Sequence, residues 1–95
     1  MDKELRERVA KYRKLTEQAL EKVSVKKGIS GKEEKIALDF LLMARNYFND
    51  AKHFEKERKL GLALAAFSYA HAWLDAGVRA GFFDGKGDDK LFTLP

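Results

Sequence analysis

Three polar residues recur at four-residue intervals in an otherwise apolar stretch of the chain: His71, Asp75 and Arg79. Residues four apart on a helix are neighbours on one face, so Asp75 is placed to accept hydrogen bonds from both His71 and Arg79. Ser68 falls in the same narrow arc. One interpretation is a salt-bridged polar seam that fixes how the helix packs. The other is a binding site in which Arg79 holds an anion and His71 titrates near neutral pH.

A second polar pair, Asp50 and His53, lies in the preceding amphipathic segment. If the two segments faced each other through these residues, two imidazoles and two carboxylates would converge, which is a ligand set suited to a divalent transition metal. The spacing matches no established metal motif, and a histidine near a helix C-terminus is also favoured there by the helix dipole. We therefore assign no metal ligand, cofactor or catalytic residue, and the candidate binding residues are His71, Asp75, Arg79 and Asp50.

Composition limits the classes of protein that this chain can represent. Its 95 residues suffice for one domain, and it contains no cysteine, which excludes disulfides and thiolate metal sites and fits a reducing cytoplasm. No apolar run approaches a membrane span, and the charged start of the chain lacks a signal-peptide core, so we expect a cytoplasmic protein. Abundant charges with few amides are typical of thermophile proteins. The net charge is +4, with 16 Lys/Arg against 11 Asp/Glu before residue 61.

The spacing of apolar residues predicts an all-α fold, a three-helix up-down antiparallel bundle with a short C-terminal apolar tail. The expected helices span residues 2–25, 31–56 and 60–80, within a single domain of residues 1–95. Ser30 and Glu33 match the capping-box pattern at the start of the second helix, and Gly81 is suited to end the third. The third helix is apolar round most of its circumference, which predicts that it is the central element.

Two further features of this half of the chain bear on packing. Gly77 is unfavourable inside a helix unless a neighbour crosses closely there, and Trp73 is expected to anchor the core. The tail, residues 82–95, is too apolar to be a disordered end, and the turn-rich middle lets its last residues fold back on the bundle or on another chain.

The third helix carries the sequence Tyr69-Ala70-His71-Ala72-Trp73-Leu74-Asp75-Ala76-Gly77-Val78-Arg79. This motif, with Met43-Ala44, Tyr47, Asp50-Ala51, Phe54, Ala63-Leu64 and Leu91-Phe92-Thr93, resembles an archaeal family known as domain of unknown function 357. The resemblance covers about residues 34–94, whereas the first helix is similar only as a generic amphipathic sequence. It implies an archaeal source and a short helical bundle, and it implies no activity, ligand or catalytic residue.

Three functions remain in competition. The leading one is a non-enzymatic protein–protein interaction or self-association module, because the all-round apolar third helix and the apolar tail exceed what three helices can bury. The second is a nucleic-acid-associated accessory protein, suggested by the basic first 60 residues, although their positive charges are interleaved with acidic ones. The third is a metal- or anion-dependent enzyme, which requires His71, Asp75, Arg79 and Asp50 to converge on a cavity.

Overall fold

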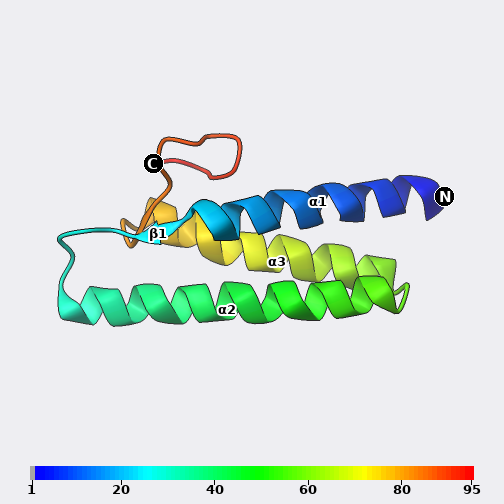
Figure 1. Cartoon of the computed structure of the whole chain (residues 1–95), viewed down its shortest axis with the longest axis horizontal. Coiled ribbons are helices and arrows are strands. Elements are labelled where there is room, and N and C mark those ends of the chain that lie inside the picture. Colours follow the sequence, from blue (N-terminus) through cyan, green and yellow to red (C-terminus); the bar gives the residue numbers. More distant parts are fainter. Residues whose placement is uncertain (1) are drawn as a thin grey trace.

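The computed structural model describes residues 2–95 and is an elongated bundle of three helices, about 47 × 22 × 16 Å in extent. The helices are α1 (Asp2–Lys22), α2 (Gly31–Lys56) and α3 (Leu60–Arg79). They run up, down and up, so α2 is antiparallel to both α1 and α3 (Figure 1). The predicted all-α, three-helix architecture is confirmed. Met1, which the predicted domain includes, lies outside the described residues.

The first helix ends earlier than its predicted end at residue 25. The chain leaves α1 after Lys22 and forms β1 (Ser24–Val25), which pairs antiparallel with β2 (Phe83–Asp84). A further backbone bond, from Lys26 N to Phe82 O at 2.9 Å, extends this pairing. A β-branched residue such as Val25 suits an extended backbone, and the pairing supplies partners for backbone groups that a continued helix would otherwise satisfy. The bundle therefore also carries a two-stranded sheet at one end.

The other helix boundaries follow local signals in the sequence. Ser30 accepts a hydrogen bond from Glu33 N, and the Glu33 side chain accepts one from Ser30 N, which confirms the predicted capping box. Gly81 adopts a positive φ of 82° just after α3, a conformation that glycine reaches without steric cost. These caps satisfy backbone groups that each helix end leaves unpaired.

The central position of α3 is also confirmed. It packs against both α1 and α2 along the bundle, whereas α1 and α2 contact each other far less. Two buried clusters follow this helix. One lies near the sheet and includes Leu74, Val78 and Phe83, and the other lies nearer the α2–α3 turn and includes Val9, Phe48 and Phe67. None of the helices described over residues 2–95 is both long and apolar enough to cross a bilayer.

The chain after β2, residues 85–95, is here called the C-terminal tail, and it folds back beside the C-terminal half of α1 (Figure 1). Leu91 and Phe92 are buried, at 9% and 3% exposure, so the tail completes the core of its own bundle. Close packing also explains Gly77, because a Cβ atom there would lie 2.1 Å from the ring of Phe83. The predicted close crossing at Gly77 is therefore made by the residue that begins β2.

Candidate functional site

His71 lies between α1 and the C-terminal tail, and both of its ring nitrogens have partners. Nε2 lies 2.6 Å from the carbonyl oxygen of Leu91, and Nδ1 lies 3.0 Å from Oγ1 of the fully buried Thr16. A carbonyl oxygen only accepts, so Nε2 must carry a hydrogen, and Nδ1 of the neutral ring then accepts the hydroxyl hydrogen of Thr16. A role in metal binding or proton transfer would have to break one of these contacts.

Asp75 and Arg79 also bind the tail rather than each other. Oδ1 of Asp75 accepts a hydrogen bond from Thr93 N at 3.0 Å, and Nη1 of Arg79 donates to the carbonyl oxygen of Leu94 at 2.7 Å. Asp75 is also 3.9 Å from His71 Nε2. The expected pairing of Asp75 with Arg79 is not found over residues 2–95, and each side chain instead meets a main-chain group.

His71, Asp75 and Arg79 are here called the tail clamp. The three clamp residues are spaced four apart, which is about 6 Å along α3 from one to the next. They meet main-chain atoms of Leu91, Thr93 and Leu94, in the same order along the tail. Side chains spaced four apart on the helix therefore bind successive main-chain groups of the segment beside it.

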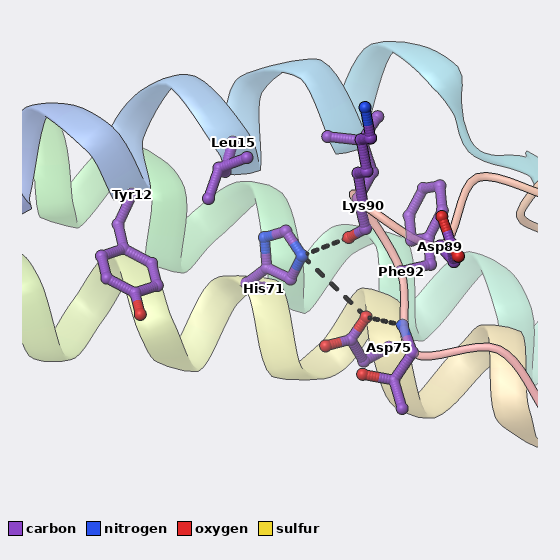
Figure 2. Close-up of a pocket in the computed structure, with 9 residues that line it drawn as sticks. Tyr12, Leu15, His71, Asp75, Asp89, Lys90 and Phe92 are labelled. Carbon is purple, nitrogen blue, oxygen red and sulfur yellow. Dashed lines mark hydrogen bonds and ion pairs between the residues drawn. The ribbon is translucent and has the colours of Figure 1, made fainter.

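A small pocket of about 240 Å³ lies where the clamp, α1 and the tail meet. Figure 2 shows the His71 ring pointing toward the tail, with the Asp75 carboxylate beside it and Tyr12 and Leu15 above on α1. Two polar atoms in this pocket already bind the tail, since His71 Nε2 contacts Leu91 O and Asp75 Oδ1 accepts from Thr93 N (Figure 2). Among residues 2–95, no group of three or more His, Asp or Glu side chains is placed to hold a metal ion.

Asp50, the fourth candidate, is not brought to this pocket. It lines a different groove, between α2 and α3, and its own neighbour His53 pairs with Glu57 at the surface, with Nε2 and Oε1 3.3 Å apart. The predicted candidates therefore divide into the tail clamp and one acidic residue on the rim of an apolar groove. The four residues therefore do not converge on a single polar cavity, as the hypothesis of a metal- or anion-dependent enzyme requires.

The sequence predicts that part of α3 stays exposed, but it does not identify which face, and that face lies toward α2. Leu62 and Tyr69 are 54% and 49% exposed. Between them and α2 lies a groove of about 420 Å³, lined by Tyr47, Asp50, Phe54, Leu62, Ala65, Ala66 and Tyr69. Tyr47 and Tyr69 meet edge to face across it, with ring centroids 4.4 Å apart. The exposed face could not be identified from the sequence, because apolar residues surround nearly the whole of α3.

Trp73 stands at the edge of this apolar surface and is only partly buried. Its ring packs edge to face on Phe40, with centroids 5.0 Å apart, which agrees with its expected role as a packing anchor. Its Nε1 atom is buried without a hydrogen-bond partner among residues 2–95. An unpaired buried indole N–H costs stability, so Trp73 stabilises the fold through the packing of its ring and not through this polar atom.

A salt bridge fastens the turn before the clamped residues to α1. Lys22 Nζ lies 2.9 Å from Asp88 Oδ2, and the other carboxylate oxygen of Asp88 accepts from the backbone N–H groups of Lys90 and Leu91. The hydrogen bond from Lys22 is the largest of several effects that hold the pKa of Asp88 below its usual value, with the backbone bond from Leu91 next. Asp88 therefore closes the turn and ties it to α1.

Comparison with known proteins places the chain in a family. The model of the family described as protein of unknown function (DUF357) matches residues 11–83, so the chain belongs to that family. This match takes in much of α1, which the sequence resemblance did not, and it stops before Leu91-Phe92-Thr93. Neither a curated protein nor a solved structure was found to match. Membership of this family brings no activity with it.

Proposed function

We propose that the protein is a non-enzymatic self-association module in which one face of α3 pairs with the same face of a second copy. The face is a seam of five residues, called here the exposed seam: Leu62, Ala65, Tyr69, Ala72 and Ala76. All five are exposed and none is charged. The observation that carries the proposal is their spacing of three, four, three and four, which is the heptad pattern of helices that pack side by side.

Most of the other apolar residues of α3 are packed against the rest of the chain. α1, α2 and the C-terminal tail pack on the other faces of the helix. Alanine at three of the five positions would let a second helix approach closely, because no long side chain holds it away. An uncharged stripe with two large apolar side chains at this exposure is typical of an interface.

The surface area of the chain is consistent with a missing partner. A compact monomer of this mass is expected to expose about 5,600 Å², whereas this chain exposes 6291 Å². The excess is close to the roughly 800 Å² that each partner buries in an interface of standard size. Pairing along the long axis of the rod would remove surface that elongation exposes.

A second copy fits the seam because the seam is complementary to itself. In an antiparallel pair about a two-fold axis at Tyr69, Leu62 of one copy lies opposite Ala76 of the other, and the two Tyr69 rings lie side by side. A large residue then meets a small one at each end of the seam, and two aromatic rings pack together at its centre. A strongly charged partner finds no opposite charge on the five seam residues themselves.

The test is a concentration series by light scattering or sedimentation on the wild type and on Ala72→Glu. Glutamate is a good helix former and position 72 is exposed, so the monomer fold should persist while two buried carboxylates oppose pairing. We expect the wild-type mass to rise from 10.9 kDa toward twice that value and the variant to stay monomeric. Gln18→Glu makes the same charge change on exposed α1 and should pair like the wild type.

Two results would overturn the proposal. One is a wild-type chain that stays monomeric at the highest concentration. The other is an Ala72→Glu variant that associates as strongly as Gln18→Glu, which would place any interface elsewhere.

A further inference from the structure

The groove between α1 and α3 holds the C-terminal tail chiefly through its main chain. We propose that this groove is a binding site for a short apolar segment held by its main chain and that the tails of two copies exchange between their grooves. The segment that binds, residues 91–94, is the occupant in the structure. The exchange uses a different side of α3 from the exposed seam, so neither proposal depends on the other.

The polar part of the recognition does not depend on which chain supplies the segment. Each hydrogen bond between the tail clamp and the tail joins a clamp side chain to a main-chain atom, at Leu91 O, Thr93 N and Leu94 O. Satisfying main-chain groups of an added segment is the way in which proteins bind extended peptides generally. A tail from a second copy would make the same three bonds.

The apolar part supplies selectivity for this particular segment. Leu91 and Phe92 are nearly fully buried, and they pack with Leu74, Val78 and Leu15. The ring of Phe92 also lies against Gly85, where a Cβ atom would come within 3.1 Å of it. The groove therefore fits a leucine–phenylalanine pair flanked by main-chain contacts, and the second copy carries that pair at the same place.

The connection between β2 and the clamped segment has the features of a hinge. Lys86 has a positive φ of 55°, which is unfavourable for a residue other than glycine, and Gly87 follows with a φ of 70°. Opening this turn would relieve the strain at Lys86 while β2 stays paired with β1. A strained connection next to a terminal segment is a common starting point for the exchange of identical elements between protomers.

The salt bridge between Lys22 and Asp88 allows a test by reversal of charge. Lys22→Asp and Asp88→Lys each place like charges together when the tail stays in its own groove. When the two variants are mixed, an exchanged pair joins opposite charges at both grooves, whereas an unexchanged chain joins them at neither. Both variants should also carry Ala72→Glu, which removes association through the exposed seam.

We expect the mixture to form a species of twice the monomer mass, at a level about tenfold above either variant alone, because two surface pairs change from repulsion to attraction. The double variant Lys22→Asp/Asp88→Lys restores the pair within one chain and is the matched control, and it should stay monomeric. Adding His71→Ala to the Lys22→Asp chain removes the same clamp contact from the unexchanged and the exchanged form, so the heterodimer level should change little.

Circular dichroism of each single variant is the check that the bundle still folds, which we expect because Lys22 is exposed and the Asp88 side chain lies at the surface of the turn. A folded mixture that stays monomeric would overturn tail exchange. A double variant that dimerises as strongly as the mixture would also overturn it, because dimerisation would then not depend on which chain supplies the charge opposite position 22. Neither result would bear on the exposed seam, which is tested separately with Ala72→Glu alone.

Discussion

Two sides of α3 treat their side chains in opposite ways. The side toward α1 carries the tail clamp, whose polar residues His71 and Asp75 are mostly covered, with side chains 17% and 29% exposed. Another face of the helix carries the exposed seam, whose largest members, Leu62 and Tyr69, are about half exposed. His71 and Asp75 are thus covered while these apolar residues are in the open, which is the reverse of the usual arrangement.

The covered side shows why a buried stripe can need polar residues. The C-terminal tail contains no helix, and after β2 no strand, so its backbone groups must find partners outside regular structure. His71, Asp75 and Arg79 supply three of those partners. On the exposed side no such need exists, and the absence of charge from the seam agrees with the proposed pairing. The same helix holds one segment of its own chain, and we propose that its exposed seam binds a second copy.

The largest expected effect separates a buried aromatic residue from an exposed one two positions away. Phe67 is fully buried, so Phe67→Ala should lower the free energy of unfolding by about 3–5 kcal/mol. Tyr69→Ala removes a half-exposed ring that packs edge to face on Tyr47 and Trp73 and should cost about 1–2 kcal/mol in the monomer. Urea unfolding at low protein concentration measures both. Similar losses would mean that the seam is part of the monomer core.

A pair of glycine substitutions sharpens the same comparison. Gly77→Ala drives a methyl group into the buried ring of Phe83 and should destabilise the protein by about 1–3 kcal/mol. Gly61→Ala, at an exposed position of α3 with no atom within 4 Å of the new methyl group, should stabilise it by up to about 1 kcal/mol. Thermal or urea unfolding measures whether each substitution raises or lowers the stability. A stabilising Gly77→Ala would show that β2 does not pack on α3 as described.

The three helices were predictable because their signals are local. The apolar spacing, the capping box at Ser30 and the glycine after α3 are each a pattern among residues only a few positions apart. The small sheet was not predictable in the same way. Ser24–Val25 is too short to show an alternating pattern, and its partner, Phe83–Asp84, lies nearly sixty residues further along the chain. A helix predicted through Val25 was therefore wrong by three residues.

The contacts of the tail clamp were harder to predict from the sequence for a different reason. Helical spacing identifies side chains that can meet one another, so it places Asp75 beside His71 and Arg79. The partners that Asp75 and Arg79 find are an N–H and a carbonyl group of the tail, and every residue except proline carries both. The sequence can nominate the clamp residues, but only the path of the tail in space shows what they hold.

The smallest expected effect concerns acid and the attachment of the tail. The Lys22 side chain and the Leu91 backbone N–H lower the pKa of Asp88 below 3.8, so the ionised carboxylate favours the folded state. That contribution is present above pH 3.8 and is lost as the pH falls through the lowered pKa of the folded protein. Asp88→Asn cannot ionise, so its deficit in unfolding free energy relative to the wild type should shrink as the pH falls below 3.8. Hydrogen exchange of the Lys90 and Leu91 amides, which Asp88 accepts from, should converge between the two proteins over the same range. The exposed seam carries no carboxylate or histidine, so acid should loosen the covered side of α3 first. A deficit that stays constant with pH would show that Asp88 does not secure the tail through its charge.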